Sequence, residues 1–182
     1  MQIRARRLGV RGAAAALVAG AVTLACSPTF DWREARPEGS GVALMFPCRP
    51  VTEERKTRIG AVVAPIHLDS CAAGGAIFSL AAIDAADPAG VTAMLDSIRV
   101  QTATNLAGAA TERGAFAPPG ATPNPRAGRV AIEGKRPDGR RVVAEAAFFV
   151  KGVRLYQATV LNADVAGGRQ AADTFFGAIR LL

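Results

Sequence analysis

The chain has 182 residues, of which 50% are hydrophobic and 20% are charged, with 22 Lys+Arg against 15 Asp+Glu. This length fits one domain, and this hydrophobic content excludes an intrinsically disordered or collagen-like chain. The formal net charge of +7 does not indicate nucleic-acid binding, because no basic stripe interleaved with aromatic residues is visible. Four arginines and no acidic residue precede Cys26, so a product beginning there carries 22 − 4 = 18 basic and 15 acidic side chains, a net charge of +3.

Residues 1–25 have the layout of an export signal peptide. A basic segment is followed by an uncharged apolar run over residues 13–24 and by the small residue Ala25. The run is shorter than the ~20 apolar residues of a typical membrane span. The six residues after Cys26 contain no basic side chain, so the far side of the run lacks the flank of a spanning helix. We therefore expect cleavage immediately before Cys26.

The stretch Val22-Thr23-Leu24-Ala25-Cys26 resembles the lipobox of bacterial lipoproteins, although Thr23 stands where that motif usually has leucine. The resemblance implies that the Cys26 thiol is modified by diacylglycerol and anchors the protein through acyl chains. Ordinary signal cleavage, with a free or paired cysteine, and an uncleaved anchor are the alternatives. By the same resemblance, Ser27 after the cysteine implies sorting to the periplasmic face of the outer membrane, with the inner membrane as the alternative address.

Residues 26–40 are expected to form a lipidated tether in front of a single domain over residues 41–182. Pro28, Pro37 and Gly39 interrupt any periodic pattern in this segment. Phe30 and Trp32 are apolar enough either to lie at the lipid interface or to dock onto the domain. The sequence leaves these two arrangements open.

With Cys26 lipidated, Cys48 and Cys71 remain as an even pair in an oxidising compartment, which predicts a disulfide. One alternative is a metal site formed by Cys48, His67 and Cys71. Another is a nucleophilic cysteine paired with His67. Both alternatives are less favoured, because the chain has no C-x-x-C motif and His67 is its single histidine.

Three strands and a helix are predicted in the first half of the folded part. Alternating apolar residues over 42–46 indicate a strand that ends at Cys48, and residues 49–60 are expected to form a charged connection. Strands over 62–68 and 77–83 follow as a hairpin or meander, with Pro65 indicating an edge or a bulge. Asp87-Pro88 has the form of an N-cap followed by proline at the first helical position. The apolar residues that then recur at helical spacing are Val91, Met94, Leu95, Ile98 and Leu106.

The second half repeats this order. Residues 114–126 contain four prolines and are expected to form a loop. Pro137-Asp138-Gly139 predicts a sharp turn between strands over 129–135 and 140–151, and Gly152 separates a further strand over 153–161. A closing amphipathic helix is predicted by an apolar stripe at i, i+3, i+4 and i+7. That stripe consists of Ala172, Phe175, Phe176 and Ile179.

The predicted order is βββα-βββα, an α+β fold in which an antiparallel sheet of about six strands is covered by two helices. Residues 41–182 resemble the PsbP-like fold, an αβα sandwich, in this order, in the turn at 137–139, in the strand over 153–160 and in the terminal helix at 172–181. The whole chain resembles a family of proteobacterial lipoproteins that begin with Cys-Ser-Pro and an Asp-Trp-Arg-Glu segment, here residues 26–28 and 31–34. The resemblance implies an address and a fold, and it implies no activity.

No familiar catalytic motif is found. Residues 128–136 differ from a Walker A loop, because five residues separate the glycines and Arg136 replaces Ser or Thr. A Gly-x-Ser-x-Gly motif is absent, and a serine triad would depend on His67 alone. Asp87 is explained as a helix cap, and Glu53-Glu54 as part of a solvated charged segment. Glu145 lies inside an apolar strand and is expected to face outward or to lie under a helix edge.

Basic side chains gather around the predicted turn at 137–139: Lys135, Arg136, Arg140 and Arg141. Such a patch fits anionic lipid headgroups, lipopolysaccharide or an acidic protein, while a solvated turn is the simpler interpretation. We predict no metal, no cofactor and no nucleic-acid partner. The sequence favours a lipid-anchored periplasmic binding or scaffolding protein, an accessory of an envelope complex. The alternative is a small periplasmic enzyme with a carboxylate or cofactor site.

Overall fold

A computed structural model describes residues 29–136 and 138–182. The predicted signal peptide and Cys26 therefore lie outside the described residues. The strands of the first half are β1 (Arg33–Ala35), β2 (Val42–Phe46), β3 (Val51–Ile59), β4 (Val62–Ala73) and β5 (Ala76–Asp84). A short 3-10 turn, η1 (Pro88–Gly90), leads into α1 (Val91–Asn105). The second half holds β6 (Ala109–Gly114), β7 (Gly128–Lys135), β8 (Arg141–Lys151), β9 (Arg154–Leu161), α2 (Gly168–Gly177) and β10 (Arg180–Leu181).

The described strands form two sheets. The larger has seven strands in the order β3-β4-β5-β9-β8-β7-β6, and the smaller has the order β1-β2-β10. All neighbouring strands run antiparallel. The two halves of the chain meet where β5 pairs with β9, from Ile77 opposite Leu161 to Asp84 opposite Arg154.

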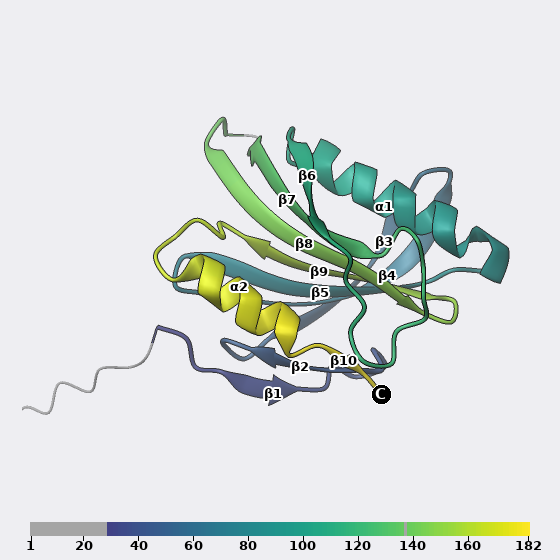
Figure 1. Ribbon diagram of the computed structural model, residues 1–182, viewed down its shortest axis with the longest axis horizontal. Coiled ribbons are helices and arrows are strands. Elements are labelled where there is room, and N and C mark those ends of the chain that lie inside the picture. Colours follow the sequence, from purple (N-terminus) through teal and green to yellow (C-terminus); the bar gives the residue numbers. More distant parts are fainter. Residues whose placement is uncertain (1–28, 137) are drawn as a thin grey trace, which may run out of the picture.

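The molecule has three layers, with the large sheet in the middle (Figure 1). Helix α1 covers one face, where its residues Leu95 and Ile98 pack with Phe148 of β8 in one buried cluster. Helix α2 and the small sheet cover the opposite face and form the second cluster. The large sheet therefore has a hydrophobic core on each of its two faces.

Both predicted helices are present, but the second ends earlier than expected: α2 stops at Gly177, Ile179 lies beyond it, and residues 180–181 form β10. The Asp87 side chain accepts a hydrogen bond from the Ala89 amide at 3.1 Å and caps the 3-10 turn that leads into α1. In α2 the rings of Phe175 and Phe176 are fully buried. The Phe175 ring lies 5.2 Å from that of Phe46 and 5.5 Å from that of Phe78, so it joins the small sheet to the large one. The α+β class with two helices is thereby confirmed.

The predicted strand count and order are wrong in detail. Residues 49–60, expected to be a connection, contain β3, and β6 was not expected at all. Residues 42–46, predicted as the first strand of the main sheet, form β2, which pairs with β1 and β10 instead. Strands β3 and β6 are the two edges of the large sheet, and nearly all of their side chains are exposed. They lack the apolar alternation that a half-buried strand shows.

The segment before β2 is docked onto the domain. Phe30 and Trp32 are partly buried against the core, and their rings lie 6.2 and 6.1 Å from the ring of Phe78. Strand β1 then pairs with β2, with Arg33 opposite Phe46. Of the two arrangements that the sequence left open for these aromatic residues, the structure has the docked one.

Candidate functional site

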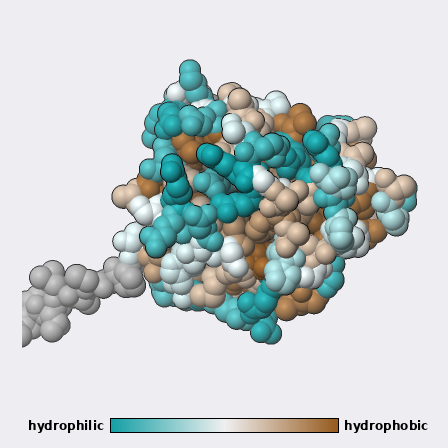
Figure 2. Space-filling view, viewed as in Figure 1, coloured by the Kyte–Doolittle hydropathy of each residue, from teal (hydrophilic) through white to brown (hydrophobic). Residues whose placement is uncertain are grey.

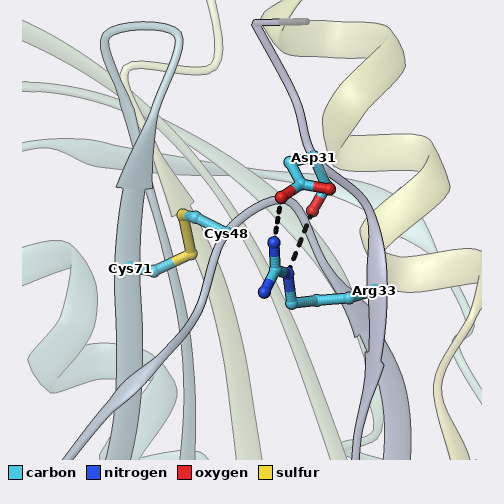
Figure 3. Close-up of a disulfide and its surroundings, with 4 residues drawn as sticks. All are labelled: Asp31, Arg33, Cys48 and Cys71. Atoms are coloured by element: carbon cyan, nitrogen blue, oxygen red, sulfur yellow. Dashed lines mark hydrogen bonds and ion pairs between the residues drawn. A yellow bond between two sulfur atoms is a disulfide. The ribbon is translucent and has the colours of Figure 1, made fainter. Parts of the chain in front are cut away.

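Cys48 and Cys71 form a disulfide, as predicted from the sequence. The two Cα atoms lie 6.0 Å apart, and the bond joins the connection after β2 to strand β4 (Figure 3). Asp31 and Arg33 form an ion pair on the adjacent N-terminal segment. Because each sulfur is bonded to the other, neither cysteine supplies the thiolate that a metal site or a nucleophile would require.

His67 lies on the solvent-accessible surface, on strand β4. Its Nδ1 lies 3.0 Å from a carboxylate oxygen of Glu54 on the neighbouring strand β3, and both side chains are well exposed. Within residues 29–136 and 138–182 no group of three or more His, Cys, Asp or Glu side chains is arranged to hold a metal ion. The histidine therefore belongs to a surface contact with a carboxylate of the neighbouring strand.

Two of the four cations of the predicted basic patch, Arg140 and Arg141, are compensated by acidic neighbours. Arg140 pairs with Asp138, and Arg141 pairs with Asp164 at 2.7 Å. The hydrogen bond to Asp138 raises the pKa of Arg140, and the pKa of Arg141 is raised mainly by its hydrogen bond to Glu133 on β7 and further by Asp164. Asp138 belongs to the turn itself, whereas Asp164 comes from the loop after β9, and its pairing with Arg141 could not be predicted from the local sequence.

Glu145 lies under the edge of α2, one of the two places expected for it. A carboxylate oxygen of Glu145 is 2.6 Å from Arg129, and the same arginine contacts Asp173 of α2 at 3.0 Å. The Arg129 guanidinium also lies 4.5 Å from the centre of the Phe176 ring. Figure 2 shows hydrophilic side chains gathered over this region, between α2 and the neighbouring strands. The cluster links α2 to the sheet through charge and stacking.

A groove runs along the C-terminal half of α1, between the helix and strands β3, β4, β5 and β9. We call it the α1 groove. Its volume is about 370 Å³, within the range of 300–1,000 Å³ typical of small-molecule sites. Apolar side chains of its floor include Ile66, Leu68, Ile77 and Leu161. Helix α1 contributes a polar wall with Gln101, Thr102 and Asn105.

A row of hydroxyl groups crosses the floor of the α1 groove. Ser70 lies opposite Ser79, and Ser79 lies opposite Thr159, in the register of three neighbouring strands. Side chains opposite one another in this way point to the same face of a sheet. The Gln157 amide, also in the groove, donates to the Thr159 hydroxyl oxygen at 3.0 Å. The floor thus offers uncharged hydrogen-bonding groups between apolar rows.

The α1 groove carries positive charge only. Its lining has one charged residue, Arg55 of the exposed edge strand β3, and no carboxylate. Among the described residues no acidic side chain forms an ion pair with Arg55. This cation is therefore available to an anionic group that enters from the side of β3.

A second hollow of about 450 Å³ lies at the other end of α1 and meets the α1 groove at Ile59, which lines both. The exposed side chains of Val62 and Val63 and part of Met94 make it apolar. Asp84 at its margin receives two hydrogen bonds from Arg154, and these lower the pKa of the Asp84 carboxyl. That carboxylate is held in its charged form by the arginine.

A scan against protein-family models and a search of curated proteins each returned no match for this chain. Within the described residues, no helix is both long enough and apolar enough to cross a membrane.

The α1 groove was not predicted from the sequence. Its residues come from four strands and from α1 with its C-terminal end. Apart from Arg55 they are uncharged polar and aliphatic side chains with no motif spacing. Ser70, Ser79 and Thr159 form one row through the strand register. Ser79 and Thr159 are neighbours in this row although they lie 80 residues apart in the sequence. Only the pairing of β5 with β9, which is a tertiary contact, places them together.

Proposed function

We propose that this protein is a lipid-anchored binding domain of the bacterial cell envelope, which holds its ligand in the α1 groove as an accessory of an envelope complex. The observation that carries the proposal is the composition of the groove: an apolar floor, a row of hydroxyls and one cation. Ligand sites in proteins combine a mainly apolar lining with a few placed polar groups in this way. The lipid at Cys26 and the periplasmic address rest on the resemblance to bacterial lipoproteins.

The chemistry of the groove favours a single-chain amphiphile with an anionic head group. Aliphatic side chains such as Leu68 and Ile77 take the apolar chain, because burial of each methylene is favourable by about 0.8 kcal/mol. Arg55 faces an anionic head without a competing carboxylate in the lining. Ser70 and its neighbours in the hydroxyl row supply hydrogen bonds to oxygen atoms of the ligand.

The anchor is tested by the mass of the protein extracted from membranes. We expect a chain of residues 26–182 carrying acyl groups, and we expect Cys26→Ala to prevent acylation and to release the protein from the membrane fraction. A mass without acyl groups would contradict the lipid anchor. So would a Cys26→Ala variant that remains in the membrane fraction. A disulfide-bonded Cys48–Cys71 pair in the same sample would agree with an oxidising compartment.

The groove is tested by titration with a fluorescent long-chain fatty acid. We expect saturable binding by the wild type and loss of binding by Gln101→Trp, because the indole fills the groove from the helix side. Val100→Trp is the matched control, since Val100 is adjacent on α1, is 60% exposed and does not line the groove. Binding that is absent from the wild type, or that is equal in both variants, would refute the site.

The role of Arg55 is tested with the same probe and its methyl ester. Arg55→Gln should weaken binding of the fatty acid about fivefold, the value of an exposed ion pair of about 1 kcal/mol, and should leave the ester unchanged. Arg58→Gln is the control, because Arg58 lies on the same strand with its side chain on the opposite face. Equal weakening of acid and ester would contradict a head-group contact.

A further inference from the structure

The described chain begins at one end of the molecule, where three turns meet. The Phe30 ring packs directly against Gly74 in the β4–β5 turn and lies close to Gly167 just before α2. In Figure 1 the loop before α2 lies at the left, between the start of the described chain below it and the β7–β8 turn above it. The N-terminal segment is thus fixed to this end by its own aromatic residues.

Hydrogen bonds connect these turns into one surface. The Asn162 amide donates to the Gly75 carbonyl at 2.9 Å and accepts from Arg136 at 2.8 Å. Arg141 reaches Asp164 in the same loop. We call this the anchor-end surface, formed by residues 29–30, 74–75, 162–167, 135–136 and 138–141. The basic turn therefore lies on the same surface as the start of the described chain.

The distance from this surface to Cys26 is short. Three peptide units separate Cys26 from Thr29, and even a fully extended chain spans at most about 11 Å over them. An acyl group on Cys26 would hold Thr29 within that distance of the membrane interface. This is comparable to the Debye length of ≈ 8 Å at physiological ionic strength, so charges on the anchor-end surface would act on lipid headgroups.

We infer that the anchor-end surface lies flat against the bilayer that holds the lipid, with Lys135 and Arg136 on anionic phospholipid headgroups. The inference rests on the proposed lipid at Cys26. Among the described residues these are the two cations of the turn that form no ion pair with a carboxylate. Arg140 and Arg141 are compensated by Asp138, Glu133 and Asp164. Clustered cations beside a lipid anchor are the arrangement that anionic membranes attract.

This placement turns one end of the α1 groove toward the lipid. Leu161 of the groove directly precedes Asn162 of the anchor-end surface, and Ile77 follows the β4–β5 turn by two residues. An amphiphile leaving the bilayer would therefore reach the apolar floor of the groove without crossing the aqueous compartment. The opposite end of the domain, with η1 and the start of α1, points away from the membrane.

The placement is tested by trypsin digestion of the lipidated protein bound to vesicles of phosphatidylethanolamine and phosphatidylglycerol. We expect cleavage after Arg140 and Arg141 to be at least tenfold slower than in neutral detergent micelles. Cleavage after Arg126 is the internal reference, because Arg126 pairs with Asp96 of α1 and its loop contacts Thr92 at the far end. We expect its rate to be unchanged.

Charge variants separate docking from simple tethering. Lys135→Gln with Arg136→Gln should restore fast cleavage after Arg140 and Arg141 on the same vesicles. Lys56→Gln with Arg58→Gln removes two exposed cations from β3 away from this surface and should keep the protection. Acylated protein whose turn is cut as fast on vesicles as in micelles, or whose protection is lost equally in both variants, would refute the placement alone. A vesicle-bound sample without acyl mass would refute the anchor and the placement together.

Discussion

Removal of the Cys48–Cys71 disulfide should lower the free energy of unfolding by about 3.4 kcal/mol. The bond joins residues 23 positions apart, and the chain-entropy relation for a loop of that length gives about 11.5 cal/mol/K, or about 3.4 kcal/mol at 25 °C. Domains of this size are stable by about 5–15 kcal/mol. The bridge therefore supplies a large part of the stability, and it does so by restricting the unfolded chain.

The measurement is urea unfolding of oxidised wild type, reduced wild type and the Cys48→Ala, Cys71→Ala double variant. Trp32 fluorescence follows the transition, because this single tryptophan packs against Phe78 of the large sheet. Reduced wild type keeps both sulfur atoms, so its agreement with the double variant would show that loss of the covalent link, and not loss of packing, causes the change. A difference below about 1 kcal/mol between oxidised and reduced protein would refute the reasoning.

Three further changes test the packing, the ion pairs and the close backbone contacts. Phe175→Ala empties a fully buried aromatic position and should lower the free energy of unfolding by about 3–5 kcal/mol, measured by thermal or urea unfolding. A decrease below about 1 kcal/mol would contradict the packing of this cluster. Asp84→Asn should cost up to about 1 kcal/mol at pH 7, since Asp84 is half-exposed. Because Arg154 lowers the pKa of Asp84, this contribution exists above the unfolded-state pKa and disappears as the pH falls through about 4 and below; a difference that grows in acid would contradict it. Gly134→Ala would place a Cβ against the backbone carbonyl at the end of α1 and should cost about 1–3 kcal/mol, whereas Gly177→Ala, in open space at the end of α2, should add about 0.4–1 kcal/mol.

The parts of the fold that the sequence predicts are those with one buried and one exposed face. The stripe of Phe175 and Phe176 in α2 and the capping residue Asp87 before α1 are local signals, and the structure has both. The Cys48–Cys71 pair follows from the cysteine count once Cys26 is set aside by its place in the lipobox-like stretch. In each case the information lies within a few residues or in the composition, so no knowledge of tertiary contacts is required.

The parts that the sequence misses depend on contacts between distant segments. Strand β10 has two residues and exists because Arg180 and Leu181 pair with Ala43 and Val42 of β2. That pairing cannot be read from a two-residue pattern. The assignment of β2 to a second sheet has the same origin. The α1 groove could not be predicted from the sequence for the same reason, because Ser79 and Thr159 meet only through the pairing of β5 with β9.

The exposed edge strands have a consequence if the protein is held on a membrane by the proposed lipid at Cys26. Molecules attached to a bilayer meet in two dimensions, and an unpaired edge with free backbone groups would join one copy to the next in a growing sheet. Strand β3 carries Glu53, Glu54, Arg55, Lys56 and Arg58 within nine residues. At the other edge, β6 shifts register between Glu112 and Gly114. Charge on one edge and an irregularity on the other oppose lateral polymerisation, so that copies anchored by the proposed lipid at Cys26 would share one membrane as separate molecules.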